Sequence, residues 1–114
     1  MTAIIDRHML QDRLSRANPP LLVEALPEKY FADAHLPSAI HLPHDAVDAL
    51  AAQRLPERNA DIVVYCANRN CQNSHIAARR LAQLGYTSVS VYADGKQDWM
   101  EAGLPVESGM VVAE

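Results

Sequence analysis

Residues 62–65, Ile-Val-Val-Tyr, constrain the fold of this chain more than any other segment. This run of four β-forming residues is too short for a buried helix, and it is apolar on both of its alternating faces, as a central strand requires. The run stops at Cys66, a polar loop continues to Asn73, and a helical pattern begins at Ser74. The sequence therefore places Cys66 where a strand ends and the N-terminus of a helix points back toward it.

This position favours chemistry at Cys66. The N–H groups left free in the first turn of a helix, together with the helix dipole, stabilise an anion. Because the thiolate is the nucleophilic form of cysteine, we expect this geometry to lower the pKa of Cys66 and to make it a nucleophile. The alternative is that Cys66 is a small buried apolar residue, a common role for cysteine.

Short apolar runs alternate with helical patterns along the rest of the chain. Strands separated by helices imply parallel crossover connections. We therefore expect an α/β fold with a central, mostly parallel sheet flanked by helices on both faces. The predicted strands are 21–23, 62–65 and 89–92, with a turn and a brief extended segment within 35–43, and the predicted helices are 8–16, 27–34, 45–55, 74–84 and 96–102.

Length and charge limit the possible partners. At 114 residues, with no linker or repeat, the chain is expected to form one domain over residues 1–114. A net charge of -4 and the lack of any basic run argue against nucleic acid or an anionic membrane as a partner. A small molecule or another protein is the expected ligand.

The apolar and cysteine content predicts the compartment. No apolar stretch approaches the roughly 20 residues that span a bilayer, and the first residues do not read as a secretion signal, so we expect a cytoplasmic protein. Its two cysteines, five positions apart, would remain thiols in a reducing compartment. No histidine lies at metal-ligand spacing from them, so no metal site is expected.

Three motifs in order resemble a known family. Residues 63–66 followed by Ala77-Ala78, Leu81 and Gly85-Tyr86 are similar to the signature of single-domain rhodaneses, which are sulfurtransferases. Residues 35–43 resemble the early loop of that family, and residues 99–106 resemble its WxxAGLPV ending. The resemblance covers about residues 21–106, and the three motifs together are far more specific than any one of them.

The resemblance implies a thiosulfate sulfurtransferase-like enzyme that works through a persulfide. Cys66 would take sulfane sulfur from a small donor such as thiosulfate and pass it to cyanide or a thiol, with a protein acceptor left open. No cofactor and no metal is implied. A persulfide anion needs several converging N–H donors, and the loop amides around Cys66 would form that anion cradle. These substrate-binding residues are Ala67, Asn68, Arg69, Asn70 and Cys71.

The loop departs from the usual family pattern. It is two residues longer than common single-domain loops, contains no glycine, and has its only basic residue, Arg69, in the middle. Arg69 would either point its guanidinium at an anionic donor or be a solvated charge. Related phosphatases and arsenate reductases also have a longer loop, but they end it in an arginine. Because Gln72, Asn73 and Ser74 stand there, we rank that chemistry well below sulfur transfer.

Other departures leave alternatives open. Cys71 would either resolve a Cys66 persulfide or sulfenic acid or anchor the loop by packing. Residues 24–26, Glu-Ala-Leu, replace the family's Asp-Val-Arg, so Glu24 would keep only part of a charged network. Asp94-Gly95 replaces Gly-Gly, a change that Asp tolerates in a turn.

A non-enzymatic function is the alternative. The domain could be a non-catalytic sulfur carrier or protein-binding module, in which the unusual loop has lost turnover. An alkylatable, low-pKa Cys66 favours chemistry, and an inert Cys66 favours a binding role.

Overall fold

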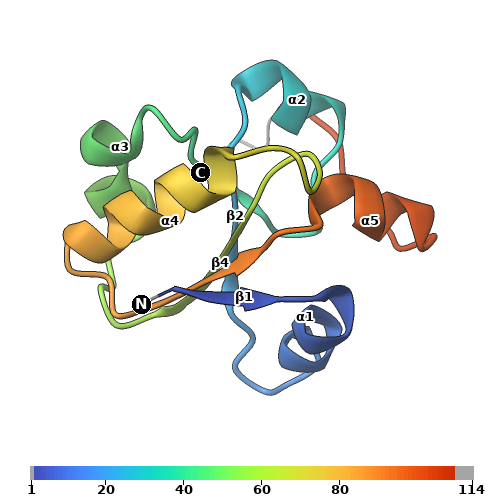
Figure 1. Cartoon of the computed structure of the whole chain (residues 1–114), viewed down its shortest axis with the longest axis horizontal. Helices are drawn as coiled ribbons and strands as arrows, with labels where there is room; N and C mark the ends of the chain where they lie inside the picture. The colour runs from blue at the N-terminus through green and yellow to red at the C-terminus, as the bar shows by residue number, and fades with distance from the viewer. Residues whose placement is uncertain (1, 110–114) are drawn as a thin grey trace.

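The computed structural model describes residues 2–109; residue 1 and residues 110–114 of the predicted domain lie outside the described part. Its strands and helices are shown in Figure 1. None of the helices described combines the length and apolar character needed to cross a bilayer. The strands are β1 (Ala3–Ile5), β2 (Leu21–Glu24), β3 (Ile40–His41), β4 (Asp61–Tyr65) and β5 (Ser88–Tyr92), and the helices are α1 (Arg7–Leu14), α2 (Glu28–Asp33), α3 (Val47–Arg54), α4 (Asn73–Gln83) and α5 (Gly95–Glu101).

The five strands form one sheet in the order β1-β5-β4-β2-β3, and every neighbouring pair is parallel. β4 is central, as its apolar sequence predicts, and its last four residues are buried. Strand β1 was not predicted from the sequence; it pairs with β5 at one edge of the sheet. In register, Tyr65 lies between Glu24 of β2 and Tyr92 of β5. The carboxyl ends of three strands therefore meet where Cys66 begins the loop.

Helices cover both faces of the sheet, which confirms the predicted α/β architecture. Figure 1 shows α3 and α4 on one side and α1 on the other. Val47 and Ala51 of α3 pack with Leu81 of α4 against β2, β4 and β5. On the opposite face, Leu10 of α1 and Trp99 of α5 form a second buried cluster with residues of β1, β2, β4 and β5. The core is thus divided into two layers by the sheet.

Helix α4 fixes the position of the loop after β4. Its Ala77, Ala78 and Leu81 are buried against the sheet, as their spacing predicts. The helix ends before Gly85, whose φ of 99° suits the left-handed conformation of a C-terminal stop. Because this apolar stripe docks α4 firmly, the N-terminus of α4 is held beside the end of β4.

Candidate active site around Cys66

Cys66 lies at the junction that the sequence predicts, immediately after β4 and beside the first turn of α4. It is only 1% exposed. Its Sγ lies 3.4 Å from the backbone oxygen of Cys71 and 3.4 Å from the hydroxyl oxygen of Ser74, which is itself fully buried. Ser74 was predicted only as the start of the helix. Its hydroxyl is a donor for a sulfur anion that the sequence interpretation missed, although serine in a first helical turn is a recognisable signal.

The pKa of Cys66 does not follow the sequence expectation. Burial, together with contact with the Cys71 side chain, raises the pKa of the Cys66 thiol to about 11. Hydrogen bonds from the Ser74 side chain and backbone lower the pKa but do not outweigh the burial. The expectation of a lowered pKa was therefore wrong, and Cys66 is a protonated thiol at neutral pH.

The start of the loop, Cys66 and Ala67, is called here the inner limb, and it is held by the turn into α5. The backbone N–H of Lys96 donates to the oxygen of Cys66 at 2.9 Å, and that of Gln97 donates to the oxygen of Ala67 at 2.8 Å. Gly95 packs directly on this limb, because a Cβ placed on it would lie 2.6 Å from the Cys66 oxygen. Gly95 has a φ of 73°, a conformation that favours glycine. Asp94, which replaces the first glycine of the family's Gly-Gly pair, has an ordinary φ of -69° and is therefore tolerated.

A buried polar network lies beneath the inner limb. The Nζ of Lys96 donates to Glu24 at 3.0 Å, to the backbone oxygen of Tyr30 at 2.9 Å and to that of Ala34. Glu24 is fully buried, and its other carboxylate oxygen accepts from the Tyr65 hydroxyl at 2.8 Å. Burial and the Glu24 carboxylate both raise the pKa of Tyr65, so Tyr65 stays neutral and acts as the donor. The network ties β2, β4, α2 and α5 together.

Lys96 was not singled out from the sequence. A lysine in a helix is usually solvated, yet Lys96 is only 8% exposed. The family resemblance places an arginine at position 26, where this chain has Leu26. Lys96 supplies the missing positive charge from a different part of the chain, so Glu24 keeps a charged partner. The signal that could have found it was Glu24 itself, since a carboxylate that ends a buried strand requires a counter-charge.

Residues 69–72 form what we call the outer limb, which is more exposed. Arg69 pairs with Asp94 through Nε at 2.8 Å and through its terminal nitrogen, and the Arg69 side chain is 79% exposed. The limb turns back on Asn68, which accepts from the Cys71 N–H at 3.1 Å and, through its side chain, from the Asn70 N–H at 3.0 Å. Two of the five amides expected in the anion cradle, those of Asn70 and Cys71, thus donate within the loop, and Arg69 is engaged by Asp94.

The histidines near the loop have structural hydrogen bonds. His35 is buried, stacks on Phe31 at 3.8 Å between ring centroids, and its Nδ1 lies 2.7 Å from the Phe31 oxygen. The Nε2 of His41 lies 2.7 Å from the oxygen of Leu26. In residues 2–109, no group of three or more His, Cys, Asp or Glu side chains is arranged to hold a metal ion.

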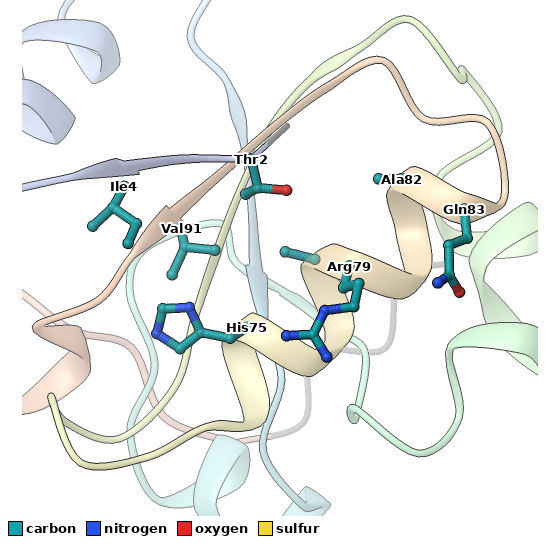
Figure 2. A pocket seen from close by; sticks show the side chains of 8 residues that line it. Thr2, Ile4, His75, Arg79, Ala82, Gln83 and Val91 are labelled. Atoms are coloured by element: carbon teal, nitrogen blue, oxygen red, sulfur yellow. The ribbon is translucent and has the colours of Figure 1, made fainter.

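Hollows lie beside the inner limb and against helix α4. One, of about 420 Å³, lies beside the inner limb and is lined by Ala67, Asn68 and residues of α5 including Met100. The other, of about 470 Å³, lies between β1 and α4 (Figure 2). In Figure 2 the ring of His75 points toward Ile4 and Val91, so His75 belongs to this second hollow.

The chain matches a known protein family and several solved structures. The model of the family described as "Rhodanese-like domain" matches residues 6–102. Among solved structures, a thiosulfate sulfurtransferase from Pseudomonas aeruginosa superimposes with a TM-score of 0.82 at 28% identity, covering 95% of this chain and 20% of that one. The Alr3790 protein from Anabaena superimposes with a TM-score of 0.82 at 27% identity, covering 94% of each chain.

A curated relative has a different description. The HTH-type transcriptional regulator Rv0324 of Mycobacterium tuberculosis is 34% identical over 102 residues. The match covers 88% of this chain but only 43% of that protein. The chain therefore spans less than half the length of this relative.

Proposed function

This chain belongs to the rhodanese-like domain family, and from that premise we propose that it is a sulfurtransferase in which Cys66 carries sulfane sulfur as a persulfide. One observation carries the proposal: the Cys66 thiol stands at the carboxyl end of the central strand, against the Ser74 hydroxyl and the first turn of α4. These are the groups that stabilise a sulfur anion.

The chemistry takes two steps. The Cys66 thiolate attacks the sulfane sulfur of a donor such as thiosulfate; the donor's S–S bond breaks and sulfite leaves with the bonding electrons. A thiol or cyanide acceptor then attacks the outer sulfur of the persulfide, and the thiolate is regenerated. Because burial raises the pKa of the Cys66 thiol, loss of its proton limits the first step near neutral pH.

The loop amides have a defined place in this proposal. The amides of residues 67–71 form the anion cradle with Ser74 once sulfur is bound. Since the Asn70 and Cys71 amides donate to Asn68 in this structure, sulfur binding must draw them away from Asn68. The inner limb need not move, because its carbonyl oxygens, not its amides, are bonded to α5.

The test is thiocyanate formation from thiosulfate and cyanide. Cys66→Ser is expected to lower kcat/KM by at least about a hundredfold, because the nucleophile is removed. Ser74→Ala is expected to lower kcat/KM by about tenfold, since it removes one hydrogen bond to a charged sulfur. Ser88→Ala, at an exposed position at the start of β5, is the matched control and should retain full activity. Equal rates for wild type and Cys66→Ser would overturn the proposal.

A second candidate, a non-catalytic sulfur-carrier or protein-binding module, is favoured by two observations. The relative from M. tuberculosis is described as a transcriptional regulator, and the resting Cys66 thiol has a raised pKa. A sulfur carrier would take up one sulfur atom per chain without turnover, and a protein-binding module would take up none. Comparing sulfur bound per chain with thiocyanate formed per chain separates the two functions.

A further inference from the structure

The two cysteines lie on opposite limbs of one loop. Cys66 is on the buried inner limb, and Cys71 is on the outer limb, where it is half-buried. The 3.4 Å separation between the Cys66 Sγ and the Cys71 backbone oxygen shows that the loop curls back over the sulfur. The Cys71 side chain is also close enough to raise the pKa of the Cys66 thiol. Both thiols are free in this arrangement.

The loop can bring the two sulfurs together by moving one limb only. The inner limb is fixed by Lys96 and Gln97 through backbone hydrogen bonds. The outer limb is held by the turn on Asn68 and by an exposed ion pair of Arg69, both of which are weak restraints in water. Disulfide formation requires Cα atoms roughly 4.4–6.8 Å apart. The Cys71 backbone oxygen already lies 3.4 Å from the Cys66 sulfur, so we expect a rearrangement of the outer limb alone to bring the two sulfurs together.

We propose that Cys71 resolves the Cys66 persulfide, which releases hydrogen sulfide and leaves a Cys66–Cys71 disulfide. The inference rests on the proposed persulfide at Cys66 and names the group that removes its sulfur. The Cys71 thiolate attacks the Cys66 Sγ, a bond forms between these two sulfurs, and the bond from Sγ to the sulfane sulfur breaks. The sulfane sulfur is reduced and leaves as hydrosulfide, which takes up a proton, while the two cysteine sulfurs are oxidised to the disulfide.

This step needs no oxidant beyond the sulfane sulfur donor. It also makes the domain self-limiting, because a sulfur atom that no acceptor removes in time converts the loop to a disulfide, which must be reduced before the next sulfur is taken up. Two equivalents of an external thiol, oxidised to its own disulfide, restore both cysteines. An acceptor such as cyanide has to reach the outer sulfur before Cys71 attacks, so Cys71 sets the lifetime of the persulfide.

The experiment follows one round of sulfur uptake in the full chain. Wild type, Cys71→Ser and Cys71→Ala are reduced, treated with glutathione persulfide, freed of excess donor and followed by intact mass spectrometry and a hydrogen sulfide assay. Two replacements of Cys71 guard against a folding defect of either one. We expect both variants to keep a persulfide, about 32 Da heavier than the reduced chain, at least about ten times longer than wild type.

In wild type we expect the persulfide to be replaced by a species about 2 Da lighter than the reduced chain, with one hydrogen sulfide released per chain and reversal by dithiothreitol. A wild-type persulfide that lasts as long as in both Cys71 variants overturns the role of Cys71 and leaves the sulfurtransferase proposal intact. Failure of all three proteins to gain sulfur overturns both proposals.

Discussion

The two limbs of the Cys66 loop are held in opposite ways. The inner limb rests on a buried network in which Lys96 pairs with Glu24, with side chains 10% and 0% exposed. The outer limb is pinned by Arg69 to Asp94, with side chains 79% and 23% exposed. Asp94 and Lys96 are separated only by Gly95, so two neighbouring charges have very different environments. A charge pair exposed to water contributes little to stability, whereas removing one partner of a buried pair is strongly destabilising.

The difference assigns a task to each limb. A rigid inner limb keeps the Cys66 sulfur beside the Ser74 hydroxyl and the first turn of α4. A loosely held outer limb can rearrange its amides around a bound sulfur and can bring Cys71 inward. The following experiments test this division.

The largest effect on stability is expected at the buried pair. Lys96→Met leaves the Glu24 carboxylate buried without its partner, and Glu24→Gln leaves the ammonium of Lys96 similarly uncompensated. Each change is expected to lower the free energy of unfolding by about 3–5 kcal/mol. The double variant should lose much less than the sum, because no isolated charge remains. Urea denaturation measures all three, and losses below about 1 kcal/mol would show that the inner limb is not anchored this way.

The pH dependence of alkylation tests the raised pKa of Cys66. Because burial raises the pKa of Cys66 to about 11, its thiolate fraction rises about tenfold per pH unit below that value. Alkylation of Cys66 by iodoacetamide in wild type, located by peptide mapping, should therefore accelerate about a hundredfold between pH 7 and pH 9. A rate that levels off below pH 8 would contradict the buried thiol.

The raised pKa of Cys66 also makes the stability of the fold depend on pH. A thiol whose pKa is raised in the folded state keeps its proton longer than in the unfolded chain. Its contribution to stability is fully present below the unfolded pKa of about 9 and is lost as the pH rises toward 11. The free energy of unfolding of wild type should fall more steeply than that of Cys66→Ser across this interval.

Gly95 tests the contact between α5 and the inner limb. Gly95→Ala places a Cβ 2.6 Å from the Cys66 oxygen and adds the strain of a φ of 73°. We expect a loss of about 2–3 kcal/mol in the free energy of unfolding. Gly103→Ala is the matched control, because Gly103 has a φ of 77° but nothing within 4 Å of the added Cβ. It should lose only about 1–2 kcal/mol. Equal losses at both sites would show that the inner limb yields to the methyl group.

The smallest effect is expected at the exposed pair. Arg69→Ala removes a surface ion pair with Asp94 and should change the free energy of unfolding by no more than about 1 kcal/mol. The part of the free energy of unfolding that this ion pair contributes, which weakens with added salt, should be absent in the variant. A loss as large as that of Lys96→Met would break the comparison, because the outer limb would then be as firmly anchored as the inner one.

The sequence was informative where one local pattern decides the structure. The apolar run of β4 and the stripe of small and apolar residues on α4 predicted the central strand and its helix, and their junction at Cys66 followed from both. β1 was missed because its three residues are an edge strand: Ile4 is 64% exposed, so the run has no buried periodicity to detect.

The parts that were missed depend on residues brought together from distant segments. Lys96 meets Glu24 across 72 positions, and no spacing rule connects them. The sign of the Cys66 pKa shift was missed for a related reason. The helix N-terminus that lowers a thiol pKa is visible in the sequence, but the burial that raises it arises in the folded loop, where Cys71 curls back over the Cys66 sulfur.

The central claim is that Cys66 holds the transferred sulfur, and mass spectrometry of the sulfur-loaded chain tests it most directly. Cys71→Ser and Cys66→Ser are incubated with thiosulfate or glutathione persulfide, and the modified residue is located by peptide mapping. We expect a gain of one sulfur atom, about 32 Da, on Cys66 in Cys71→Ser and no gain in Cys66→Ser. No gain in Cys71→Ser, or an equal gain in Cys66→Ser, would contradict it.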